Sequence, residues 1–141
     1  MRKDEAEAVR LYRIVAEKGE PGGMYNLGRM YATGRGVDED LSQAVHWYRR
    51  AADSGFSYAS NNLGVLHLEG RGVRKDRDEA IKWFKKAAEQ GHPDGAFKVG
   101  IAYLEEPIDS QRLRLARQWL TQAAKAGRAS AKEALAVVET M

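Results

Sequence analysis

The chain has no cysteine, which excludes disulfide bonds and thiolate metal sites. Only three of its 141 residues are proline and 43% are hydrophobic, so we expect no long disordered tract. No apolar run approaches the roughly 18 residues that a membrane span needs. The first ten residues, MRKDEAEAVR, are charged and precede no apolar segment, which is unlike a signal peptide. We expect a soluble protein, cytosolic or periplasmic, whose chain is trimmed or belongs to a longer array.

The net charge of +3 is unevenly distributed. Residues 1–70 hold 9 basic and 10 acidic side chains, a balance of −1, and residues 71–141 hold 14 and 10, a balance of +4. A basic half can attract an acidic partner, although a solvated helical surface with interspersed charges explains the same pattern.

Identical residues recur at intervals of 36 positions, with no gap anywhere in the chain. The recurring sets are Gly28, Gly64 and Gly100; Gly19, Gly55, Gly91 and Gly127; Trp47, Trp83 and Trp119; Ala8, Ala44, Ala80 and Ala116; and Ala16, Ala52, Ala88 and Ala124. Such a period predicts a repeat architecture. We expect one solenoid domain over residues 1–141. It comprises a half unit at 4–20, full units at 21–56, 57–92 and 93–128, and a terminal half unit at 129–141.

The second half of each unit has the pattern of an amphipathic helix. Asp40, followed by Gln43, is expected to cap this helix by accepting hydrogen bonds from its first N–H groups, and Asp4 and Asp76 share the register. The glycine at position 55 would end the helix in the left-handed conformation. The apolar face in the first full unit consists of Ala44, Trp47, Tyr48, Ala51 and Ala52.

A shorter helix, from about residue 22 to 33, fills the first half of each unit. Gly28 lies inside it, and a mid-helix glycine costs about 1 kcal/mol relative to alanine, so its repetition implies close packing against a neighbouring helix. The count is about eight helices, from 4–18 to 130–140. Neither helix of a unit can bury its apolar face alone, which predicts an all-α fold, an α/α superhelix.

The pattern A-x3-L-G-x2-Y-x2-G-x-G-V, followed by A-x2-W-Y/F-x2-A-A-x2-G, resembles that of the Sel-one-like repeat (SLR) family, a relative of the tetratricopeptide repeat. The resemblance covers nearly the whole chain and implies an adaptor that binds proteins, in families that are mostly bacterial and often exported. It implies no catalytic residue. In the central unit it rests on Ala59, Leu63, Gly64, Gly70, Gly72, Val73, Ala80, Trp83, Phe84, Ala87, Ala88 and Gly91.

Two positions depart from the family pattern. The first full unit has Gly23 where the family favours alanine, and the third has EEPID, from Glu105, where the first two have GRGV. Pro107 and Asp109 are plausible turn formers there, and Ser110 is the expected N-cap of the next helix. In the GRGV loops we expect Gly34 to end the first helix and Gly36 to permit the return, because no strand or further glycine completes a phosphate-binding loop.

No catalytic, cofactor or metal site is predicted. His46, His67 and His92 lack the spacing of metal ligands, and His67 occupies a packing position shared with Tyr31 and Tyr103. Serine-nucleophile motifs are absent and no carboxylate pair stands out. The tryptophans, one per unit, belong to the core. Nucleic-acid binding is not expected, because the inner-face residues do not repeat in a base-reading pattern.

The first helices of the units should line the concave face of the superhelix. This face would be polar at its N-terminal end and apolar at its C-terminal end. Asn26 and Asn62 would bind a peptide backbone or bond within their own turn, and Phe97 and Ile101 would bind a partner or pack on the final helix. The predicted partner-binding residues are Tyr25, Asn26, Arg29, Asn61, Asn62, Val65, Leu68, Glu69, Phe97, Lys98 and Ile101.

We therefore expect a non-catalytic module that binds a protein or peptide in this groove. Two alternatives remain from the sequence: a protein that neutralises a bacterial toxin, and an envelope-associated hydrolase. The open ends of the array, at residues 4–18 and 130–141, offer surfaces for self-association, because terminal repeats need polar caps.

Overall fold

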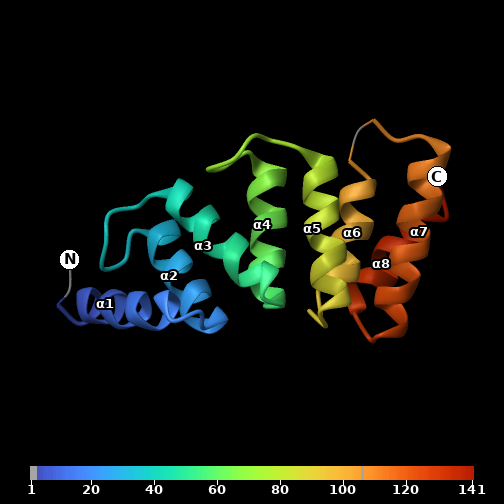
Figure 1. Ribbon diagram of the computed structural model, residues 1–141. Helices are drawn as coiled ribbons and strands as arrows, with labels where there is room; N and C mark the ends of the chain where they lie inside the picture. Colours follow the sequence, from blue (N-terminus) through green and yellow to red (C-terminus); the bar gives the residue numbers. More distant parts are fainter. Residues whose placement is uncertain (1–2, 106) are drawn as a thin grey trace.

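The computed structural model describes residues 3–105 and 107–141 (Figure 1). These residues form eight α-helices and no strand, so the all-α solenoid is confirmed. None of the described helices is long and apolar enough to cross a membrane. The helices are α1 (Lys3–Glu17), α2 (Pro21–Thr33), α3 (Leu41–Asp53), α4 (Ser57–Glu69), α5 (Arg77–Glu89), α6 (Gly95–Tyr103), α7 (Ser110–Lys125) and α8 (Ala129–Val138).

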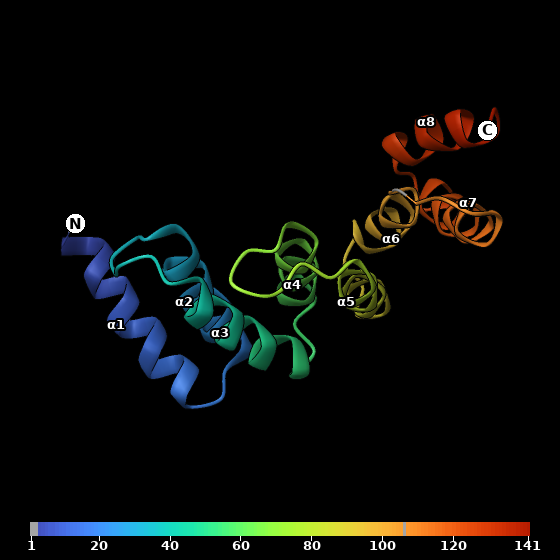
Figure 2. The same ribbon diagram turned by 90° about the horizontal axis from the view of Figure 1, so that it is seen from above.

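The helices pack in antiparallel pairs along a curved path. The closest partners are α2 with α3, α4 with α5 and α6 with α7, which leaves α1 and α8 as single helices at the two ends. Seen from above, α4, α6 and α8 lie on the inner side of the arc and α3, α5 and α7 on its outer side (Figure 2). The inner helix of each pair therefore faces the concave side, as expected.

Close contact inside each pair depends on a glycine in the inner helix. A β-carbon on Gly28 would lie 2.8 Å from the ring of Tyr48, and one on Gly100 would lie 2.7 Å from the Leu120 side chain. Gly64 stands in the same relation to Phe84. The packing reason predicted for these glycines is confirmed.

The GRGV loop of the first full unit is a joint between helices. Gly34 has φ 66° and ψ 34°, the left-handed conformation, and its N–H donates to the Met30 carbonyl. Asp40 then caps α3 by accepting a hydrogen bond from the Gln43 N–H at 3.1 Å. Gly36, with φ 72°, lies so close to the Glu5 carbonyl that no side chain would fit. The loop thus also joins its unit to the preceding outer helix.

Two capping predictions are wrong. Ser110 is the first residue of α7 and Asp109 is its N-cap, accepting from the Arg112 N–H at 2.8 Å, because a carboxylate reaches the free N–H groups of the first turn. Asp4 lies inside the first turn of α1 and does not precede the helix. In the third unit α6 ends at Tyr103, and its C-cap Leu104 has a right-handed conformation in place of the left-handed glycine of the other two units. Glu106, the second residue of the EEPID stretch that stands in place of GRGV, lies outside the described residues.

Candidate interaction surface

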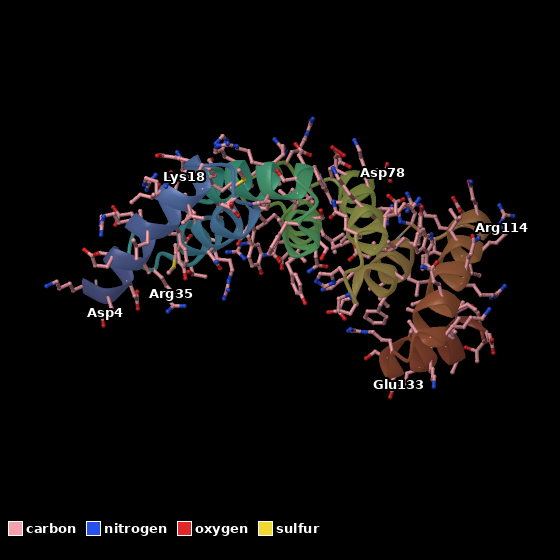
Figure 3. All side chains as sticks on the ribbon, turned by 60° about the horizontal axis from the view of Figure 1, so that its bottom comes forward. Asp4, Lys18, Arg35, Asp78, Arg114 and Glu133 are labelled. Carbon is pink, nitrogen blue, oxygen red and sulfur yellow. The ribbon has the colours of Figure 1, made fainter. Side chains whose placement is uncertain are left out.

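The eleven predicted partner-binding residues lie on α2, α4 and α6, the inner helices of the three complete pairs. Arg29 and Glu69 are exposed, and the other nine are partly buried. Figure 3 shows the arc with its side chains, with Asp78 and Arg114 on the outer side. The predicted residues thus lie on the three inner helices, and they differ in what they contact.

An aromatic strip occupies the N-terminal half of this face. The ring centroid of Tyr25 lies 5.0 Å from that of Phe56 and 6.3 Å from that of Tyr58. The strip continues from Tyr58 to His92, whose rings meet edge to face at 4.6 Å. The guanidinium of Arg29 lies 5.7 Å from the centre of the Tyr25 ring, within cation–π range. Tyr58 is 49% exposed, so a large aromatic surface is open to solvent in the middle of the strip.

Asn62 connects two units of the solenoid. Its side chain hydrogen-bonds to Tyr48, across the boundary between the first and second full units. Burial raises the pKa of the Tyr48 hydroxyl, and the Asn62 hydrogen bond and the positive charge of Arg29 act in the opposite direction. The neighbouring Asn61 is different, since its buried Oδ1 has no hydrogen-bond partner among the described residues.

A small cavity marks the N-terminal end of the groove. It measures about 140 Å³ and Asn26 and Arg29 contribute to it, together with Tyr12 of α1. Tyr12 stands at the register of Tyr48 in the first full unit. Its full lining is Tyr12, Asn26, Arg29, Met30, Thr33 and Arg35.

The apolar C-terminal end of the predicted groove is largely taken up by intramolecular packing. Phe97 and Ile101 pack against the cluster that joins α7 and α8, so they do pack on the final helix, one of the two alternatives left by the sequence. The guanidinium of Arg128 lies 4.5 Å from the centre of the Phe97 ring, and it also forms an ion pair with Asp94. Val65 and Leu68 likewise pack against the core between α5 and α6.

His92 is the buried polar residue at the far end of the strip from Tyr25. Its Nδ1 accepts a hydrogen bond from the Asp94 N–H at 3.0 Å, and only 8% of the residue is exposed. Burial lowers the pKa of His92, and the positive charges of Lys98 and Arg128 lower it further. His67, by contrast, is buried at its predicted packing position, and neither of its ring nitrogens has a hydrogen-bond partner among the described residues.

Phe56, Tyr58 and His92 were missed by the sequence prediction, which considered only positions inside the first helix of each unit. The 36-residue register could have pointed to Phe56 and His92. Position 56 corresponds to 92 and 128, which hold Phe, His and Arg. In the second and third units this residue contacts the one at position 58 or 94. It thus links the two ends of its own unit.

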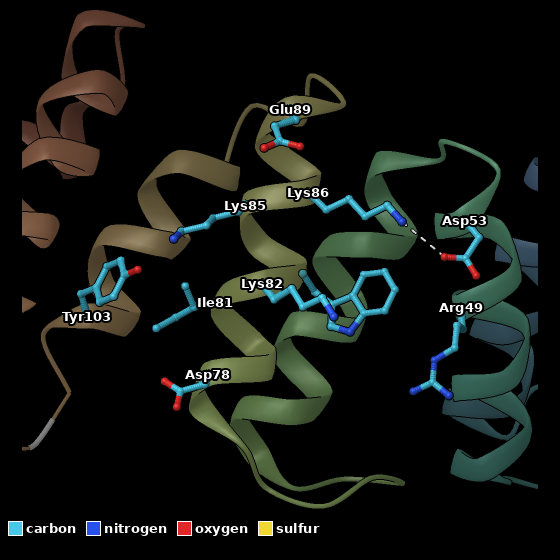
Figure 4. A pocket seen from close by; sticks show the side chains of 10 residues that line it. Arg49, Asp53, Asp78, Ile81, Lys82, Lys85, Lys86, Glu89 and Tyr103 are labelled. Atoms are coloured by element: carbon cyan, nitrogen blue, oxygen red, sulfur yellow. Dashed lines mark hydrogen bonds and ion pairs between the residues drawn. The ribbon is translucent and has the colours of Figure 1, made fainter.

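The outer side carries a larger hollow, of about 790 Å³ (Figure 4). Lys86 bridges it, with its ammonium 3.3 Å from an Asp53 oxygen and 5.1 Å from the centre of the Trp83 ring. None of the residues that line this hollow belongs to the predicted partner-binding set. Among the described residues, no group of three or more histidine or acidic side chains could hold a metal ion. The lining residues are Arg49, Asp53, Asp78, Ile81, Lys82, Trp83, Lys85, Lys86, Glu89 and Tyr103.

The stacked helix pairs, with one helix of each pair on the concave side, define a repeat solenoid of the kind that binds other proteins. The model of the Sel1 repeat matches residues 1–20, 21–56, 57–92 and 93–127, and the chain belongs to the Sel1 repeat family. Proteins of this family are generally protein–protein interaction modules, and they are typically non-catalytic.

Solved structures from bacteria resemble the chain. A Sel1 repeat protein from Oxalobacter formigenes is 32% identical, with a TM-score of 0.85, and the match covers 93% of this chain and 54% of that one. A protective antigen of uropathogenic Escherichia coli strains, which displays an SLR fold, is 40% identical, with a TM-score of 0.81 and coverage of 93% and 28%. The chain thus spans about half of the first protein and less than a third of the second.

A more distant structure shares the fold. An immunity protein from Pseudomonas aeruginosa is 23% identical, with a TM-score of 0.55, and the match covers 87% of this chain and 46% of that one. No curated protein matches the chain.

Proposed function

We propose that the chain is a non-catalytic interaction module that binds an extended segment of a partner protein along its concave face, centred on the aromatic strip. The observation that carries this proposal is the exposure of Tyr58 between Tyr25 and His92. Aromatic side chains with an open face and little conformational freedom are the residues that dominate binding energy at protein interfaces. A solitary exposed aromatic would be unremarkable, but a strip that spans two units gives a peptide several adjacent contacts.

The charge beside the strip favours a partner segment with acidic residues. Arg29 is exposed and lies over the Tyr25 ring, where a carboxylate of the partner would reach it. Lys98 is partly buried further along the same side, and its positive charge reaches His92. This half of the predicted set is thus available for binding, whereas Phe97 and Ile101 are occupied by packing.

Site-specific photo-crosslinking tests the proposal directly. A photoreactive phenylalanine analogue in place of Tyr58 should crosslink to a partner in cells of the source organism. The same analogue in place of Lys82, whose side chain is 75% exposed on the outer side, is the matched control and should give a different pattern or none. Identical crosslinked species from both positions would contradict the proposal.

Substitutions then measure the contribution of the strip. Tyr58→Ser and Arg29→Glu change exposed side chains, so the helical circular dichroism spectrum should stay intact. Each should weaken binding of the crosslinked partner by about tenfold or more, the scale of a hot-spot residue. Lys82→Glu should leave the affinity unchanged. Wild-type affinity in the double variant Tyr58→Ser/Arg29→Glu would show that the partner binds elsewhere.

The toxin-neutralising protein and the envelope hydrolase remain without specific support. The likeness to an immunity protein, at 23% identity, concerns the fold alone. A hydrolase would need a nucleophile or an acid–base pair at a named position, and no contact among the described residues singles one out. A toxin among the crosslinked partners of Tyr58 would revive the first of these functions within the same groove.

A further inference from the structure

The hollow on the outer side lies between α3 and α5, with Tyr103 of α6 at its edge (Figure 4). These two outer helices do not pack closely on each other, because each of them packs on the inner helix α4. A space of about 790 Å³ therefore stays open between their outward-facing side chains. All of the residues that line it lie between positions 49 and 103, inside the array.

One cation of this hollow has no acidic partner. Two of the three acidic residues that line it, Asp53 and Asp78, form ion pairs with basic side chains at 3.3 Å. The third, Glu89, lies at the top of the hollow, away from Arg49 (Figure 4). Arg49 is exposed, and it forms no hydrogen bond, ion pair or ring contact with the described residues. Its guanidinium therefore has unused donors beside the hollow.

The 36-residue register explains why Arg49 is free. The corresponding cation of α1, Arg13, donates a hydrogen bond to the Tyr31 hydroxyl at 2.8 Å. The lysine at this position of α5 likewise lies 5.5 Å from the centre of a tyrosine ring. The matching position of α4 holds His67 instead, whose two ring nitrogens have no hydrogen-bond partner among the described residues. Arg49 thus lacks the tyrosine that engages the other two cations.

A buried donor in the same hollow also lacks a partner. Trp83 lines the hollow and is 9% exposed, and its indole Nε1 has no hydrogen-bond partner among the described residues. A buried N–H without an acceptor is destabilising, so an acceptor brought by a ligand is favoured there. The ammonium of Lys86 lies 5.1 Å from the centre of the ring, and its ion pair with Asp53 is partly exposed, so this side chain can move aside at little cost.

We infer that this hollow is a second binding site, which receives a carboxylate from an acidic segment of a partner protein between Arg49 and the indole N–H of Trp83. The unused groups are hydrogen-bond donors, so their complement is an acceptor, and a guanidinium binds a carboxylate by two parallel hydrogen bonds. A volume of about 790 Å³ favours a segment of a protein over a single free anion, because sites of this size enclose much larger molecules. Lys82 and Lys85 line the same hollow and offer positive charge to further acidic residues of the segment.

Nuclear magnetic resonance resolves this site, because each of the three tryptophans gives one indole N–H resonance. A hexaglutamate peptide, added to the isotope-labelled chain, should shift the Trp83 resonance until it saturates and leave the Trp47 resonance in place. Trp47 is the matched reference, since its buried Nε1 also lacks a partner among the described residues but it does not line the hollow. A hexaserine peptide should shift neither. An unchanged Trp83 resonance, or equal shifts of Trp83 and Trp47, would overturn the inference.

Two pairs of variants measure the contribution of each donor. Arg49→Gln should weaken peptide binding by about tenfold or more, because hydrogen bonds to a charged acceptor are lost. Its neighbour Arg50 is also exposed but lies over Trp47, outside the hollow, so Arg50→Gln should bind like the wild type. Trp83→Phe, which removes the N–H and keeps an aromatic ring, should weaken binding, whereas Trp47→Phe should not. Equal affinities within either pair would contradict the proposed site.

A change outside the hollow provides an independent arm. In the variant His67→Tyr the new hydroxyl should engage Arg49 as Tyr31 engages Arg13, so the affinity for the peptide should fall although no lining residue has changed. Tyrosine occupies the same register position in two other units, and thermal unfolding checks that the variant is folded. Wild-type affinity in a folded His67→Tyr chain would show that Arg49 does not hold the peptide.

Two further measurements separate this site from its alternatives. Inorganic phosphate at the concentration of the peptide should shift the Trp83 resonance less than the peptide does, and an equal shift would show that the hollow takes a free anion instead of a protein segment. Tyr58→Ser and Arg29→Glu should leave the Trp83 shift unchanged, because the aromatic strip shares no residue with the hollow. Loss of the shift in these variants would place the peptide at the strip and overturn the second site.

Discussion

The ring of Tyr48 lies against Gly28 so closely that a β-carbon on the glycine would come within 2.8 Å of it. This contact sets the distance between the two helices of the first complete pair. The repetition of the contact at Gly64 and Gly100 keeps that distance the same along the solenoid. It therefore determines how regularly the concave face, and the strip on it, are built.

Gly64→Ala should lower the free energy of unfolding by about 1–2 kcal/mol. The new methyl group would collide with the ring of the fully buried Phe84, and overpacking of this kind outweighs the gain in helix propensity. Gly22→Ala is the matched control, since this helical glycine has open space around it, and the change should be neutral or stabilising by up to about 1 kcal/mol. Urea unfolding of both variants measures the difference. Equal stability of the two would refute the packing role of Gly64.

Gly34→Ala should destabilise the protein by roughly 1 kcal/mol. The residue has φ 66°, and a side chain with a β-carbon resists this left-handed conformation. The substitution of its exposed neighbour, Arg35→Ala, should change stability by less than about 0.5 kcal/mol. Thermal unfolding followed by circular dichroism checks both. A Gly34→Ala variant that melts like the wild type would contradict the left-handed turn.

Asp109→Ala should cost about 1 kcal/mol, because it removes the side chain that caps α7. Ser110→Ala should have little effect, since Ser110 is already inside the helix. This pair of variants separates the observed cap from the one expected from the sequence. Chemical unfolding gives both values, and a larger loss for Ser110→Ala would favour the original expectation.

Stability should fall with decreasing pH on account of His92. Its pKa in the folded protein is below the ordinary value of 6.5, so the unfolded chain binds more protons than the folded one between the two values. The contribution is complete above pH 6.5 and is lost as the pH falls from 6.5 through the folded pKa. Protonation also removes the Nδ1 acceptor that the Asp94 N–H uses.

Urea unfolding between pH 5 and 8 measures this dependence. His92→Asn retains an acceptor but cannot titrate, so the fall in stability between pH 6.5 and 5 should become smaller. His46→Asn, at an exposed position, should leave the slope unchanged. If His92→Asn has the same slope as the wild type, another group causes the pH dependence.

Much of the fold could be predicted from the spacing of a few residue types. Trp47, Gly28 and Gly55 recur with their counterparts every 36 positions, and each has a local requirement: an apolar face, a close approach or a left-handed turn. The loop after α6 could not be predicted in the same way. There the glycines are absent, and the choice between Asp109 and Ser110 as cap depends on the path of the preceding residues.

The sequence predicted which helices line the concave face, but it did not predict which of their side chains pack inside the protein. Arg29 is exposed over the ring of the partly buried Tyr25, whereas Phe97 is covered by Arg128 and by the cluster of α7 and α8. Asn62 engages Tyr48 across a unit boundary. Periodicity assigns a residue to a face of its helix, but it does not say which side chains from other helices reach that face.

The sequence by itself determined the repeat, its eight helices and the glycine joints, because these depend on contacts and conformations within 36 residues. The tertiary structure alone decided which inner-face side chains stay free and which become packing, since this depends on the curvature that brings adjacent units together. It also decided that Tyr58 stands open between the rings of Tyr25 and His92.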